Sequence, residues 1–142
     1  MKTIIKKPHL FFFSLIPLFI IVGLIRTGNV IDVTIYNTFF AVKTHHWCYF
    51  SAVFTSLIGL NYYVLYWAKK PTIHILSLFH ILFQIAALIP FIFCVFFLNS
   101  KTFFATDSID FYALLSASYI LFVISICLHV LNFILALIIK KK

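Results

Sequence analysis

Two adjacent histidines, His45 and His46, are the residues of this sequence best suited to chemistry. Imidazole nitrogens ligate metal ions and haem iron, and they carry protons near neutral pH. Neighbouring positions of an α-helix point about 100° apart, so only one of the two side chains can face a given buried site. Trp47 and Tyr49 follow closely, and both residue types favour the boundary between a membrane and water. Composition alone therefore favours an interfacial role for the pair, with a cofactor site as the alternative.

Further polar residues lie within very apolar stretches, at spacings that place them on one face of a helix. One such set comprises Ser77, His80 and Gln84, and a later one comprises Ser118, Ser125, His129 and Asn132. Polar side chains in a membrane are expected to face other helices, so the two faces predict a hydrogen-bonded seam. The alternative is that His80 and His129 act as ligands or proton carriers. Both lie roughly 10 to 15 Å from the same end of their helices, which is close enough to meet.

The sequence does not support chemistry that depends on carboxylates, paired cysteines or a phosphate-binding loop. The apolar stretches contain no Asp or Glu, which removes carboxylate-driven proton transport and acid–base hydrolysis. Two histidines without a third ligand make a weak metal site. The three cysteines form no Cys-x-x-Cys pair, and the sequence has no Gly-rich phosphate loop. We therefore predict no catalytic residues.

The elements that must position these residues are membrane-spanning helices. Of the 142 residues, 64% are apolar and 10% are charged, and the mean hydropathy is +1.14. A water-soluble domain of this size carries about 25% charged residues, so the lipid bilayer is the expected partner of most of the surface. The net charge of +8 is divided among short clusters between the apolar stretches. These charge clusters therefore indicate how the helices are oriented across the membrane, and no nucleic-acid interface is expected.

Four stretches approach the roughly 20 residues that a helix needs to cross a bilayer. They are residues 10–25, 46–67, 73–98 and 111–139. The predicted fold is all-α, a single transmembrane domain of four helices over residues 1–142. A cleaved signal peptide is the alternative for the first stretch, but no small-x-small cleavage site follows Ile25, so a retained helix is expected. In the second stretch Ser51, Thr55 and Gly59 place small side chains at every fourth residue, which lets helix backbones approach closely.

Lysine and arginine counts predict the orientation of the helices. Eight of these residues lie before the first stretch, between the second and third, or after the fourth, and three lie on the opposite side. Both termini are therefore expected in the cytoplasm, across a bacterial inner membrane. Residues 68–72 predict a tight turn, and residues 99–110 predict a polar loop in which Ser108 or Asp110 caps the last helix. Residues 26–44 are expected to lie along the outer membrane surface.

The stretch IDVTIYNTFFAVKTHHW, residues 31–47, resembles the start of the tenth helix of haem–copper terminal oxidase subunit I, the catalytic subunit of cytochrome c oxidase. In that family it reads approximately L-D-[VI]-x-[LIV]-H-D-T-Y-[YF]-V-[VI]-A-H-F-H-[YF], and the match needs no gap. His46 falls on the histidine that ligates the low-spin haem, whereas Thr44 falls on the ligand of the high-spin haem. Residues 114–137 resemble the final helix of that subunit, with Ser116, Ser118 and Asn132 as counterparts of its polar residues.

The resemblance implies a respiratory-chain membrane protein that binds haem through His46, with His45 at the family's intervening aromatic position. It covers only about the last four of the family's twelve helices, so the copper ligands and the other low-spin haem ligand have no counterparts here. By itself the chain cannot form the oxygen-reducing centre. Either a second axial ligand comes from another oxidase subunit or a second copy, or the site is empty and the chain only packs beside an oxidase complex. Two alternatives remain open. One is a non-catalytic four-helix scaffold or assembly factor, and the other is a small transporter lined by the polar faces.

Overall fold

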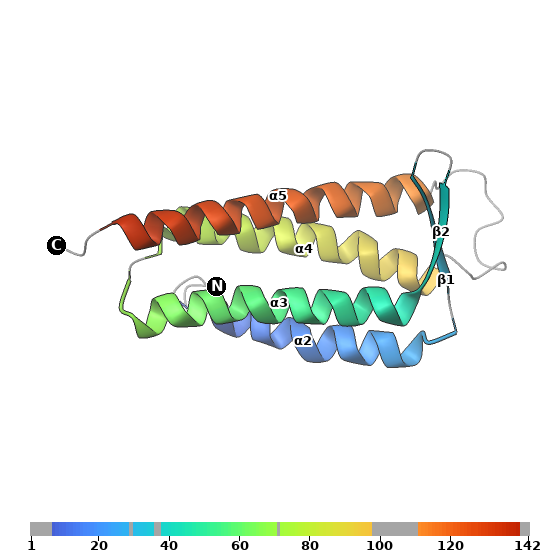
Figure 1. The fold of residues 1–142 in the computed structure, drawn as a ribbon, viewed down its shortest axis with the longest axis horizontal. Coiled ribbons are helices and arrows are strands. Elements are labelled where there is room, and N and C mark those ends of the chain that lie inside the picture. Colours follow the sequence, from blue (N-terminus) through green and yellow to red (C-terminus); the bar gives the residue numbers. More distant parts are fainter. Residues whose placement is uncertain (1–6, 29, 36–37, 71, 98–110, 140–142) are drawn as a thin grey trace.

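The computed structural model describes residues 7–28, 30–35, 38–70, 72–97 and 111–139. Four helices run up and down beside one another, and a two-stranded hairpin lies at one end of the bundle (Figure 1). In chain order the elements are α2 (Pro8–Ile25), β1 (Val30–Ile35), β2 (Thr38–Lys43), α3 (Thr44–Trp67), α4 (His74–Phe97) and α5 (Phe111–Ile138).

Each of the four helices is long and apolar enough to cross a membrane. The shortest, α2, has 18 residues and α3 and α4 have 24 each, which corresponds to roughly 27 and 36 Å at about 1.5 Å per residue. The four predicted spans are thus confirmed as helices, although α3 already begins at Thr44. The predicted cap at Ser108 or Asp110 lies outside the described residues.

The helices associate as two antiparallel pairs, with α2 packed along α3 and α4 packed along α5. The first turn of α2, the connection after α3 and the last turn of α5 all lie at the end opposite the hairpin (Figure 1). The chain turns at residues 68–69, within the tight turn predicted for residues 68–72, of which residue 71 lies outside the described residues. Lys69 adopts a φ of 53° there, the left-handed conformation that often ends a helix, and the N–H of Lys70 donates to the carbonyl of Leu65 at 2.9 Å.

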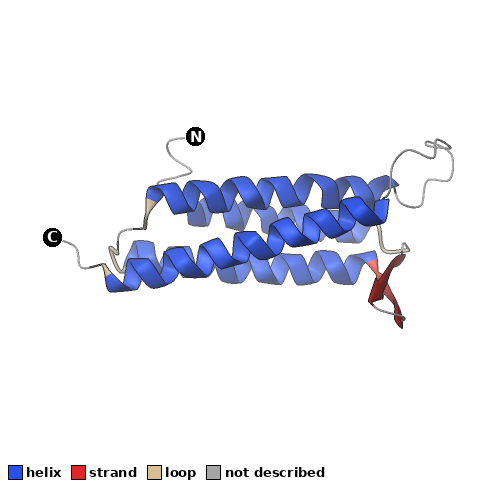
Figure 2. Ribbon diagram, turned by 90° about the horizontal axis from the view of Figure 1, so that it is seen from above, coloured by secondary structure: helices blue, strands red, loops and turns tan. Residues whose placement is uncertain are grey.

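The segment between α2 and α3 differs from the sequence expectation. Residues Val30–Ile35 pair antiparallel with Thr38–Lys43, with Val30 opposite Lys43, and the hairpin is the red element in Figure 2. The predicted bundle of four helices thus carries one element that was not predicted, because alternating β-branched residues favour a strand and the ladder pairs the backbone groups of this segment. Ile31 of the hairpin is buried against Val22, Cys48 and Val95 at the end of the bundle. That residues 26–44 lie along the outer membrane surface stays a prediction.

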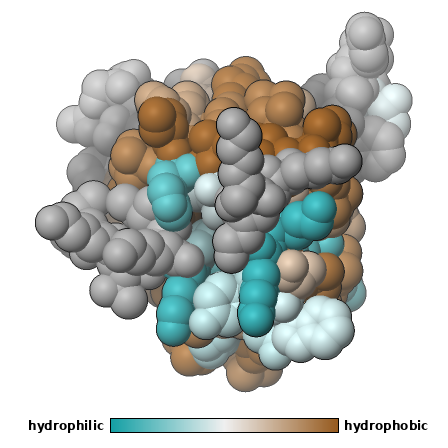
Figure 3. All heavy atoms as spheres, turned by 90° about the vertical axis from the view of Figure 1, so that its left-hand side faces the viewer, coloured by the Kyte–Doolittle hydropathy of each residue, from teal (hydrophilic) through white to brown (hydrophobic). Residues whose placement is uncertain are grey.

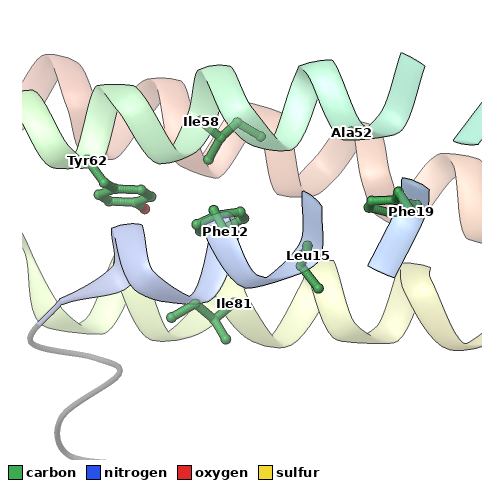
Figure 4. Packing of buried hydrophobic residues seen from close by; sticks show 7 residues of the cluster. All are labelled: Phe12, Leu15, Phe19, Ala52, Ile58, Tyr62 and Ile81. Carbon is green, nitrogen blue, oxygen red and sulfur yellow. The ribbon is translucent and has the colours of Figure 1, made fainter. Parts of the chain in front are cut away.

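The larger hydrophobic cluster joins the two helix pairs (Figure 4). Phe12 of α2 is fully buried at its centre. Its ring stacks on Tyr62 of α3 and on His80 of α4, with ring centroids 5.6 and 4.6 Å apart. One aromatic side chain of the first helix thus contacts both a neighbour in its own pair and the opposite pair. The buried members of the cluster are Phe12, Leu15, Phe19, Ala52, Ile58, Tyr62 and Ile81.

Helices α2 and α3 approach closely at two glycines. A Cβ atom added to Gly59 would lie 2.7 Å from Cε1 of Phe13, and one added to Gly23 would lie 3.0 Å from Cε1 of Tyr49. Both distances are shorter than ordinary contacts between carbon atoms, which prefer about 3.5 to 4.0 Å. The atoms nearest to Gly59 belong to the side chains of Phe13 and Phe12, so the missing side chain of Gly59 makes room for the Phe13 ring.

We expect Gly59→Val to destabilise the packing of α2 on α3 by about 1–3 kcal/mol, because the added branch overlaps the Phe13 ring and forces the helices apart. The measurement is the unfolding free energy of the detergent-solubilised protein. Gly28→Val is the matched control, since a Cβ at Gly28 meets no atom within 4 Å. A loss of stability that is equal in the two variants would contradict the explanation.

Candidate functional site

The predicted polar seam lies buried between α4 and α5. Asn132, Ser125 and Ser118 of α5 are buried and follow one another at intervals of seven residues, or about two helical turns. Because the two helices are antiparallel, each step back along α5 meets a later residue of α4. Three hydrogen bonds result: Asn132 Nδ2 donates to Ser77 Oγ (2.9 Å), Ser125 Oγ to Gln84 Oε1 (3.1 Å) and Ser118 Oγ to the carbonyl of Ala87 (2.7 Å).

Asn132 is the junction of this seam with the rest of the bundle. Its Oδ1 accepts a hydrogen bond from the backbone N–H of Ile73 at 3.1 Å. Ile73 directly precedes the first residue of α4, where backbone N–H groups have no partner within the helix. Asn132 Nδ2 also donates to the Tyr62 hydroxyl at 3.3 Å. One side chain of α5 therefore caps α4 and reaches α3 as well.

His80 of α4 is fully buried beside Tyr62. The Tyr62 hydroxyl receives a hydrogen bond from Asn132, so its own proton is directed to His80 Nδ1, which lies 2.8 Å away. Nδ1 is then an acceptor, and a neutral imidazole in this arrangement carries its proton on Nε2. His80 Nε2 is buried and has no hydrogen-bond partner.

His129 of α5 lies directly against His80, with ring centroids 5.1 Å apart. Its Nε2 accepts from Asn61 Nδ2 of α3 at 3.2 Å, so its proton is on Nδ1, which is also buried and without a partner. The predicted meeting of the two histidines inside the bundle is confirmed. However, both remaining nitrogens carry protons and neither offers a lone pair to a cation. The described residues also contain no group of three or more metal-ligating side chains.

The His45–His46 pair lies at the start of α3, beside the hairpin. Thr44 and Cys48 are buried and define the face of α3 that points into the bundle, whereas His46 is exposed. His45 is half-buried, with Nδ1 3.2 Å from the carbonyl oxygen of Thr27. The two imidazole centroids are 4.1 Å apart. His46 lies about 200° from Thr44 around the helix, so it cannot ligate a group held inside the bundle.

Two members of the hydrogen-bond network, the buried Tyr62 and the exposed Asn61, were not predicted from the sequence. Tyr62 belongs to an aromatic run that also suits a membrane interface. A signal was present for Tyr62. It follows Thr55 and Gly59 at steps that keep it on the same helical face, and both of those residues are buried.

Basic residues close the two ends of the bundle. Arg26 Nη2, just after α2, donates to the carbonyl of Phe96 at 3.0 Å, and the guanidinium lies 4.7 Å from the centre of the Phe96 ring. At the other end Lys70 Nζ donates to the carbonyl of Leu137 at 3.3 Å. Both acceptors lie in the last turn of a helix, where carbonyl groups lack partners and a positive charge is favourable.

We expect Asn132→Leu to destabilise the protein by about 1–3 kcal/mol, because the change leaves the Ile73 N–H without an acceptor and removes the bonds to Ser77 and Tyr62. The unfolding free energy in detergent measures the effect. Ser116→Ala, on the exposed side of α5, should change it by less than about 0.5 kcal/mol. If the two variants unfold alike, Asn132 is not the junction of the bundle.

Comparison with known proteins gives no relative on which to base an assignment: no family model matches the chain, and neither a curated protein nor a solved structure matches it.

Proposed function

We propose that this chain is an integral membrane protein whose four helices form a non-catalytic scaffold. The observation that carries the proposal is the distribution of polar groups. Buried polar side chains form hydrogen bonds between α4 and α5, among them Asn132, Ser125 and Gln84. Large apolar side chains lie outside, and Leu24 and Ile89, for example, are 60% and 66% exposed. Polar residues inside and apolar residues outside suit a protein surrounded by lipid.

The hydrogen bonds of the interior side chains support the scaffold proposal. Hydrogen bonds across helices hold α3, α4 and α5 in register, and the interior histidines direct N–H groups, not lone pairs, at their surroundings. No described residue of the four helices is an Asp or Glu that could take or supply a proton. Such an interior fits a protein that presents a defined outer surface to partners in the membrane. A transporter lined by the same polar faces would instead need these groups free for a solute.

The orientation that we propose places both termini in the cytoplasm of a bacterial inner membrane. Lys69 and Lys70 lie at the bundle end where α2 begins and α5 finishes, and Figure 3 shows hydrophilic side chains gathered on that end face. Basic residues favour the cytoplasmic side. The hairpin end, with His46, would then face outward.

Cysteine labelling tests this orientation. In a Cys127→Ala background, Ala41→Cys in the hairpin should react with a membrane-impermeant maleimide added outside intact cells. Lys69→Cys should react only after the membrane is opened. Both positions are exposed. The reverse pattern would show the opposite orientation, and equal labelling at both positions in sealed cells would refute membrane insertion.

A second candidate function is haem binding at His46 as part of a respiratory complex, as the resemblance to oxidase subunit I suggests. The favouring observation is that the His46 side chain is exposed at the bundle end. Haem held there would lie outside the bundle, and its second axial ligand would come from another oxidase subunit or another copy of the chain. Iron with two imidazole ligands is low-spin, and the axial ligands set its potential.

Haem titration of the purified protein, His45→Ala and His46→Ala tests this candidate. If His46 is a ligand, the low-spin visible spectrum should appear with wild type and His45→Ala and should be lost with His46→Ala. Identical spectra for all three proteins, or no binding to any, would leave the pair as interfacial residues and favour the scaffold.

A further inference from the structure

Asn61 of α3 is exposed although it lies well within a helix that suits a membrane. It precedes Trp67, the last residue of α3, by six positions, which is about 9 Å along the helix. Trp favours the membrane interface, so Asn61 belongs to the hydrocarbon region. Within the described helices the other two carboxamides, Gln84 and Asn132, are both buried. Asn61 is therefore the exception among them.

The carboxamide of Asn61 is only partly satisfied within the chain. Its Nδ2 donates one hydrogen bond, to His129 Nε2 at 3.2 Å. A carboxamide has a second N–H and a carbonyl oxygen, and no described residue bonds either of them. Polar groups that face hydrocarbon without partners are costly, and for this reason polar residues of membrane helices are found against other helices. The exposed position of Asn61 thus indicates a surface that another helix covers.

The residues around Asn61 have the spacing of a helix–helix seam. One face of α3 carries the exposed residues Phe50, Leu57, Asn61, Val64 and Ala68, whose spacings of three, four and seven residues are the pattern by which one helix packs along another. Phe54, between the first two of these, is half-buried against Phe122 of α5, so α5 borders this face on one side. Phe50, Leu57 and Val64 are 56%, 53% and 52% exposed. A single asparagine within such an apolar seam fixes register and favours one assembly state.

A second copy of the chain supplies the matching group. Copies inserted with the same topology have parallel α3 helices, and a twofold axis along the membrane normal places identical residues at the same height. Asn61 then lies opposite Asn61. A carboxamide is self-complementary, since the N–H of each copy can donate to the carbonyl oxygen of the other. We propose that the protein forms a parallel homodimer through the Asn61 seam of α3, with the two Asn61 side chains paired at its centre.

The inference rests on the proposed membrane insertion, so the experiment reports the two separately. Donor- and acceptor-labelled protein is reconstituted into phosphatidylcholine vesicles, insertion is verified by resistance to alkaline extraction, and energy transfer is followed as lipid is added. Protein that is extracted would overturn both proposals. Protein that is inserted but shows no energy transfer beyond random proximity would overturn only the dimer, and would leave Asn61 to a lipid carbonyl or a different protein.

Variants identify the group responsible. Asn61→Leu should weaken dimerisation about 5- to 30-fold, in line with hydrogen bonds between membrane helices, whereas Asn61→Gln should retain most of it. The matched control is His129→Phe, which breaks the same internal hydrogen bond but leaves the Asn61 carboxamide on the surface. It should dimerise like the wild type. Undiminished dimerisation of Asn61→Leu, or equal weakening by His129→Phe, would overturn the proposal.

Cross-linking locates the interface independently. In a Cys127→Ala background, Val64→Cys on the seam should form a disulfide-linked dimer under mild oxidation. Leu82→Cys, which is 45% exposed on α4, should not. Cross-linking at position 82 in place of position 64 would assign the contact to a different face and overturn the proposal.

Discussion

The arrangement of the helices depends on the hydrogen bonds of one buried side chain, Asn132. In the membrane-inserted state that we propose, apolar helix faces gain little by leaving lipid for one another, so hydrophobic burial does not select one register over another. Asn132 supplies that selection because it meets Ser77, Tyr62 and the N–H of Ile73 at once. A shift of α5 by one turn, about 5.4 Å, would break all three contacts. Ser125 and Ser118 repeat the constraint further along the same face.

The two helix pairs are held by different means, and this difference determines where polar groups lie. Helices α2 and α3 are brought together by the absence of side chains at Gly23 and Gly59, a contact that uses dispersion forces and needs no polar group. Helices α4 and α5 are joined by a ladder of hydrogen bonds. Phe12 lies between the pairs, and its stacking on Tyr62 and His80 connects the tightly packed side of the bundle to the hydrogen-bonded side.

The parts of this structure that could be predicted are those where a residue type is rare in its surroundings. Polar residues in apolar stretches are costly, so the periodic spacing of Gln84, His129 and Asn132 predicted the seam. Tyr62 shares a helical face with Thr55 and Gly59, but tyrosine is common at membrane interfaces, and only the fold aims its hydroxyl at His80. The face that His46 occupies depends on the helix starting at Thr44 and on which neighbours pack there. The local sequence pattern encodes neither the start of the helix nor its packing neighbours. The pairing of the hairpin strands is likewise not determined by either strand alone.

The tautomers of the buried histidines explain why this interior suits packing better than ligand chemistry. His80 can expose a lone pair at Nε2 only if its proton moves to Nδ1, and Nδ1 then ceases to accept from Tyr62. The Tyr62 hydroxyl would lose the acceptor of its proton while Asn132 still donates to it. Leaving a buried donor without a partner costs about 1–3 kcal/mol. In the present tautomer the unpartnered donor is the buried His80 Nε2–H, so a cation at Nε2 would exchange one unpartnered donor for another. It would also break the hydrogen bond from Tyr62 to His80, which links α3 to α4 at the Asn132 junction.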